Sequence, residues 1–136
     1  MMFTPPVVSA LTAGVLIILQ MALMLSVALA RRNNRQSLGE GGNSELLRAI
    51  RRHGNLAENA GIFIAGFTLL ELLGVDRLRL EILCGAFVLG RISHVIGLSM
   101  KRTVNPYRFG GVVITVAVGL AMGVWLIRKT LPHLLP

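Results

Sequence analysis

The chain has 136 residues, of which 54% are hydrophobic and 15% charged, and its formal net charge is +8. A soluble domain of this length needs more polar side chains to cover its surface, so the composition excludes an ordinary soluble fold. A bilayer core takes about 20 apolar residues per helix, so four helices and short loops use up the chain. We therefore predict a single membrane domain over residues 1–136, an all-α integral membrane four-helix bundle.

Four helices are predicted in chain order. The first, over residues 5–30, is apolar except for Gln20, and a basic, glycine-rich loop follows it. The second, over 44–74, begins with polar and charged residues and becomes apolar only in its second half. The third and fourth, over 77–99 and 106–128, are mostly apolar and end in polar or basic residues.

Polar residues mark the helix boundaries. Asn43 or Ser44 can cap the second helix, and Asp76 can cap the third. Asn105 followed by proline is typical of a helix cap and its first helical position. Gly74 is expected to end the second helix.

The basic residues gather in two places, and their positions predict the topology. One is the loop after the first helix together with the start of the second helix, and the other is the loop between the third and fourth helices. Basic loops are retained on the cytoplasmic side of a membrane, so both basic loops should face the cytoplasm. The two termini should then face the opposite side. A nucleic-acid partner is not expected, because the chain lacks RNA-binding aromatic patterns and zinc-ligand spacing.

A polar stripe enters the membrane on the second helix. Arg48, Arg51, Asn55 and Glu58 are spaced to share one helix face. Ionisable groups at that depth face protein or water rather than lipid. The stripe could form internal salt bridges, or it could line a polar pocket. Cations outnumber the acid, which favours a pocket for an anionic ligand.

Two further groups lie near the same end. Arg91 and His94 are three residues apart on the third helix, where a histidine is more often a hydrogen-bonding strut than a catalyst. No metal ligand is spaced near it, so no metal is expected. The start of the fourth helix offers free backbone N–H groups beside Arg108, which suits either an anion or a plain anchoring role.

The run from Arg48 to Glu58 resembles the helix-two signature of the MAPEG family, the membrane-associated proteins of eicosanoid and glutathione metabolism. That signature is an arginine, an asparagine four residues on and an acid three further, as in Arg51, Asn55 and Glu58. The segment 90–98 is similar to the helix-three pattern of bacterial members. The resemblance extends over essentially the whole chain.

This resemblance implies a homotrimer in a bacterial inner membrane, with glutathione bound between subunits. Arg51, Asn55 and Glu58 would hold the tripeptide, and Arg31 or Arg32 could reach a carboxylate. We also assign Arg91 and His94 to this binding site. Arg108 falls where catalytic members stabilise the glutathione thiolate, with Arg102 as the rival.

The sequence departs from eicosanoid-forming members, because Asn59, His94 and Leu98 stand where many of these have tyrosine, and Tyr107 is the only tyrosine. The leading hypothesis is a glutathione transferase or peroxidase-like protein that takes apolar electrophiles from the bilayer. One alternative is a non-catalytic MAPEG protein that binds a lipid or small anion. A small multidrug exporter ranks lower, because the first helix lacks the carboxylate that couples protons.

Overall fold

The predicted all-helical fold is confirmed. The computed structural model describes residues 5–102 and 104–134, and within them the chain forms four long helices and a short 3-10 turn. The helices are α1 (Val7–Asn33), α2 (Ser44–Leu72), α3 (Arg77–Ser99) and α4 (Pro106–Thr130), and the turn is η1 (Leu131–His133). The bounds of α2 and α3 lie within two residues of the expected ones, whereas α1 continues three residues past the expected end.

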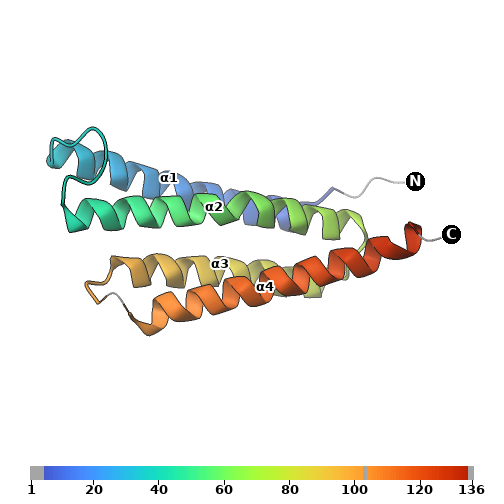
Figure 1. Ribbon diagram of the computed structural model, residues 1–136. Helices are drawn as coiled ribbons and strands as arrows, with labels where there is room; N and C mark the ends of the chain where they lie inside the picture. The colour runs from blue at the N-terminus through green and yellow to red at the C-terminus, as the bar shows by residue number, and fades with distance from the viewer. Residues whose placement is uncertain (1–4, 103, 135–136) are drawn as a thin grey trace.

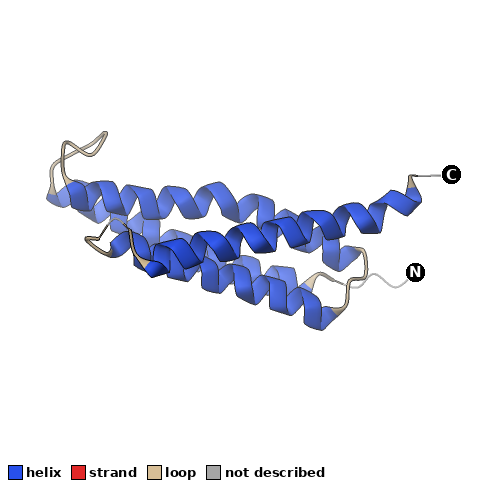
Figure 2. Cartoon of the chain, turned by 60° about the horizontal axis from the view of Figure 1, so that its bottom comes forward, coloured by secondary structure: helices blue, strands red, loops and turns tan. Residues whose placement is uncertain are grey.

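The four helices run alongside one another as an antiparallel bundle (Figures 1 and 2). α1 packs mainly against α2, and α3 packs mainly against α4. The α1–α2 and α3–α4 loops lie at one end of the bundle, and both termini lie at the other (Figure 1). The bundle therefore has a loop end, which carries the basic clusters, and a terminal end.

Three segments of the described residues are long and apolar enough to cross a bilayer. They are Val7–Asn33, Arg77–Ser99 and Pro106–His133. α2 is of similar length, but its charged first half keeps it out of this set. It lies beside the apolar helices in the bundle (Figure 1). Of its polar stripe, Arg48 and Asn55 are partly buried, whereas Arg51 and Glu58 are exposed.

Side chains close the helix ends as the sequence predicts. Asn43 accepts hydrogen bonds from the backbone N–H groups of Glu45 and Leu46, so Asn43 rather than Ser44 caps α2. Asp76 caps α3 and Asn105 caps α4 in the same way. Gly74 ends α2 with a φ of 67°, a conformation that glycine adopts without strain.

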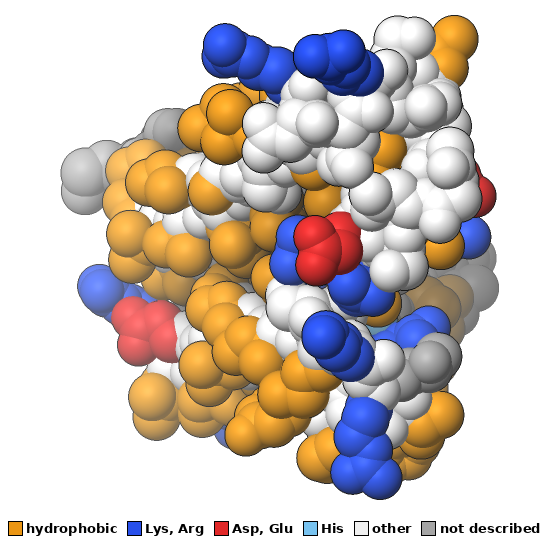
Figure 3. Space-filling model, turned by 90° about the vertical axis from the view of Figure 1, so that its left-hand side faces the viewer, with side chains coloured by type: hydrophobic (Ala, Val, Ile, Leu, Met, Phe, Trp, Pro, Cys, Tyr) orange, Lys and Arg blue, Asp and Glu red, His pale blue; other side chains and the backbone are white. Residues whose placement is uncertain are grey.

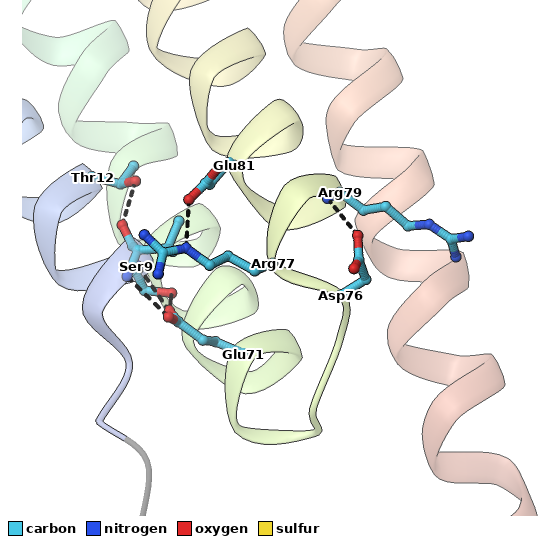
Figure 4. Close-up of polar contacts among 8 residues, drawn as sticks. Ser9, Thr12, Glu71, Asp76, Arg77, Arg79 and Glu81 are labelled. Atoms are coloured by element: carbon cyan, nitrogen blue, oxygen red, sulfur yellow. Dashed lines mark hydrogen bonds and ion pairs between the residues drawn. The ribbon is translucent and has the colours of Figure 1, made fainter.

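A carboxylate from α2 caps the start of α1, which the sequence did not indicate. Glu71 accepts hydrogen bonds from the backbone N–H groups of Val8 and Ser9, at 2.9 and 2.8 Å, and from the Ser9 hydroxyl at 2.6 Å (Figure 4). The negative charge also suits the positive end of the α1 dipole. The last turn of α2 thereby fixes the first turn of α1.

Aromatic rings join α2 to α3 in the core. The rings of Phe63 and Phe87 stack with centroids 4.0 Å apart, and Phe67 meets both edge-on. Leu16 from α1 and Met122 from α4 are buried in the same cluster. The core thus draws on all four helices.

Glycines allow α3 and α4 to approach backbone to backbone. A Cβ atom on Gly111 would lie 2.7 Å from the Gly90 carbonyl oxygen and 2.8 Å from the backbone nitrogen of His94. A Cβ atom on Gly97 would collide with the backbone of Arg108. Small residues at such contacts are typical of helix packing in membranes, where close van der Waals contact drives association.

We predict that Gly111→Ala destabilises the protein by about 1–3 kcal/mol, the usual cost of overpacking. Gly110 is the matched control, because a Cβ atom there meets nothing within 4 Å. Gly110→Ala should be neutral or stabilising by up to about 1 kcal/mol, since alanine favours helix. Unfolding of both variants in detergent would measure the difference, and equal stabilities would contradict the close contact.

Candidate functional site

A polar cavity of about 930 Å³ opens at the loop end of the bundle, between α2, α3 and the start of α4. Its residues come from four stretches of the chain. They are Glu40 in the first loop; Ser44, Leu47, Arg48, Ile50, Arg51, Gly54, Asn55 and Glu58 on α2; His94, Gly97 and Leu98 on α3; and Met100, Lys101, Arg102, Arg108 and Val112 beyond it.

The cavity is strongly cationic. Five of its lining residues are arginine or lysine, and two, Glu40 and Glu58, are acidic. Figure 3 shows this end of the molecule with Lys and Arg side chains spread over it and apolar side chains on its flanks. Such a surplus of donors with fixed positive charge suits an anionic ligand, above all one with carboxylate or phosphate groups.

The predicted α2 stripe lies along one wall of the cavity. Arg48, Arg51, Asn55 and Glu58 all contribute to the lining, as their helical spacing requires. Arg48 lies 3.9 Å from the exposed carboxylate of Glu45, a weak surface pair. Internal salt bridges therefore do not account for the stripe within the described residues, and the pocket interpretation fits better.

Arg91 lies behind this wall rather than in it. Its side chain is buried, and its Nη2 atom donates a 2.6 Å hydrogen bond to Oδ1 of Asn55. Its Nε atom is buried without a partner, and no carboxylate of the described residues pairs with it. This bond directs Oδ1 of Asn55 toward Arg91 and leaves the N–H₂ group of the same side chain available to donate. Arg91 thus orients Asn55 as a donor.

His94 and the start of α4 form the opposite wall. The Nδ1 atom of His94 lies 3.4 Å from the carbonyl oxygen of Arg108. The Arg108 backbone N–H donates to the Asn105 side chain, which holds the first turn of α4 in place. Arg108 is exposed and lines the cavity beside Arg102, so both candidates for thiolate stabilisation are at the site.

The predicted ligand residue Arg31 is engaged elsewhere within the subunit. Its Nη1 atom donates to the carbonyl oxygens of Gln36, Ser37 and Gly39, at 3.4, 3.2 and 3.0 Å. These hydrogen bonds hold the loop that follows α1 against the end of that helix. Arg31 is not part of the cavity lining.

Two charged lining residues, Lys101 and Glu40, were not among the residues that the sequence analysis assigned to the pocket. Arg48 was predicted as part of the stripe, one turn before Arg51, but it was not assigned to glutathione. The positions of Glu40 and Lys101 depend on the paths of two loops, which no periodic pattern encodes. Among the described residues, no group of three or more His, Cys, Asp or Glu side chains could hold a metal ion.

Comparisons with known proteins show which family the chain belongs to. Residues 9–128 match the model of the MAPEG family. The Inner membrane protein YecN of Escherichia coli strain K12 is 38% identical over 91 residues, which cover 66% of this chain and 69% of that protein. The protein of the same name from Escherichia coli O6:H1 has the same identity and coverage. No solved structure matches the chain. Because the family match extends over most of the sequence and agrees with the four-helix bundle, the chain belongs to the MAPEG family of membrane proteins.

Proposed function

We propose that this protein is a membrane glutathione transferase or peroxidase-like enzyme of a bacterial inner membrane, with its cavity facing the cytoplasm. The observation that carries the proposal is the cationic cavity, in which the Arg51–Asn55–Glu58 stripe of α2 faces the α4 N-terminus and Arg108. Glutathione has two carboxylates, which guanidinium groups can bind, and an ammonium group, which a carboxylate can bind. Its thiol can lie at a helix N-terminus, which favours the thiolate.

The mechanism follows from this pairing. Arg51 and the N–H₂ group of Asn55 would bind acceptor groups of the tripeptide, and Glu58 would receive its ammonium group. The thiol would release its proton to water beside Arg108, because a guanidinium and a helix N-terminus both stabilise a thiolate. The thiolate would then attack an apolar electrophile, forming a carbon–sulfur bond while the leaving group departs or a strained ring opens. Reduction of a lipid hydroperoxide would begin with the same thiolate.

A homotrimer is part of the proposal. The cavity of one subunit is open, and its five cations exceed its two acids. A neighbouring subunit would help to enclose the ligand and exclude water, which strengthens the charged contacts. A non-catalytic protein that binds an anionic ligand remains the second candidate, favoured by the single tyrosine, Tyr107, which lies exposed.

Substitutions of Arg51 and Arg108 should separate binding from chemistry. Arg51→Ala should weaken glutathione binding by about 1.5–3 kcal/mol, because a charged hydrogen bond to the ligand is lost. Arg108→Ala should bind glutathione nearly as well but lose the ultraviolet absorbance of the bound thiolate at neutral pH, and turnover with it. Calorimetry, difference spectra and a conjugation assay would measure these effects.

The matched control is Arg77→Ala, which removes the same charge at the terminal end of the bundle and should change neither property. If Arg108→Ala keeps both its thiolate signal and its turnover, Arg108 does not have this role and Arg102 is the next residue to test. If the unsubstituted protein binds glutathione but never forms a thiolate, the non-catalytic function is the better account.

The contact between Arg91 and Asn55 yields a second prediction. Asn55→Asp should weaken glutathione binding at least about tenfold, because a carboxylate replaces the N–H₂ donor at the cavity wall. The same substitution should leave stability unchanged or raise it, because the buried guanidinium of Arg91 gains a carboxylate partner. Binding and thermal unfolding of one sample would measure both effects, which a misfolded variant could not show together.

Asn59→Asp is the control for this experiment. Asn59 lies one turn further along α2, donates to the Asn55 carbonyl oxygen, and does not line the cavity. Its substitution should leave glutathione binding nearly unchanged. If Asn55→Asp binds glutathione as well as the unsubstituted protein does, Asn55 presents no donor to the ligand.

A further inference from the structure

A second groove lies at the terminal end of the bundle, where α3 begins and α4 ends. Its volume is about 700 Å³, and it is lined by Arg79, Leu120, Ala121, Val124, Trp125, Arg128 and Lys129. Its composition changes along α4, from apolar side chains to a pair of cations in the last turn. None of the lining residues is acidic.

Arg79 extends across this groove from α3 to α4. Its backbone N–H donates to the Asp76 carboxylate at 3.1 Å, but its side chain points away from Asp76 toward α4 (Figure 4). Its guanidinium carbon lies 6.0 Å from the centroid of the Trp125 ring, at the outer limit of a cation–π contact. No carboxylate among the described residues pairs with it.

Arg77, two residues before Arg79, has a carboxylate partner. The Nε atom of Arg77 donates to the Glu81 carboxylate at 2.7 Å, and in Figure 4 this side chain lies on the side of α1 and Glu71. Two arginines of one helical turn thus have separate environments. Arg77 is neutralised within its helix, whereas Arg79 brings an uncompensated charge to Arg128 and Lys129.

The groove lies where a membrane span meets water. α4 is one of the apolar spans, and tryptophan and basic residues at the end of a span are characteristic of the interface. The exposed Leu120 and Val124 continue the groove toward the hydrocarbon. An occupant must therefore combine a negative charge at interface depth with an apolar chain below it.

We propose that this groove binds an anionic phospholipid. Its phosphodiester would lie among Arg79, Arg128 and Lys129, and one acyl chain would run along Leu120 and Val124, past Trp125. A zwitterionic phospholipid fits less well, because its own ammonium group would meet three cations. The site lies at the opposite end of the bundle from the polar cavity and does not depend on the function proposed for that cavity.

Trp125 is the only tryptophan of the chain, so its fluorescence reports on this groove directly. The full-length protein would be placed in phosphatidylcholine vesicles containing a small fraction of brominated phosphatidylglycerol or brominated phosphatidylcholine, whose bromines quench tryptophan on contact. At equal fractions, brominated phosphatidylglycerol should bind about tenfold more favourably or better, given three nearby cations.

Arg79→Gln should reduce this preference about fivefold, whereas Arg77→Gln, with the same charge change two residues away, should leave it within about twofold. Equal quenching by the two lipids would overturn the proposal, as would equal losses in the two variants. If neither brominated lipid quenches Trp125, the groove is covered by protein and the proposal is wrong.

Discussion

The close approach of α3 and α4 is the constraint on which the candidate site depends. Gly90, Gly97 and Gly111 let the two backbones touch, and Gly97 sets the first turn of α4 directly against α3. That contact places the α4 N-terminus and Arg108 across the cavity from the stripe on α2. A side chain at Gly97 or Gly111 would push α4 away from α3 and widen the cavity in which the proposed thiol ligand would bind.

The buried guanidinium of Arg91 adds to the positive charge of the cavity lining. It lies behind Asn55 with no carboxylate of the described residues to neutralise it, in a region where an uncompensated charge is costly. An anion in the cavity would lower that cost, so ligand binding and the stability of the bundle should be coupled. At the opposite end of the bundle, the charge of Arg79 also has no carboxylate partner among the described residues, but this side chain is exposed. An exposed cation suits a lipid headgroup rather than a small solute.

Much of the fold was predictable because it is encoded locally. Hydropathy located the helices, and the caps at Asn43, Asp76 and Asn105 depend on side chains within three residues of the bonds they form. The α2 stripe was predictable for the same reason, since helical spacing alone puts its members on one face. Side-chain direction between elements was not predictable. Arg31 faces its own loop because that loop turns back through residues of positive φ, and Arg91 faces Asn55 because of how α3 is rotated against α2.

The central claim is that the cationic cavity binds glutathione through its carboxylates. The most direct measurement is a calorimetric titration of the solubilised protein with glutathione and, in parallel, with its diethyl ester, which keeps the thiol and ammonium groups but lacks both negative charges. The account predicts saturable binding of glutathione, weakened by added salt, and binding of the diester that is weaker by at least about tenfold, since each charged contact contributes about 1.5–3 kcal/mol. Equal affinities for the two compounds, or no saturable binding of glutathione, would contradict it.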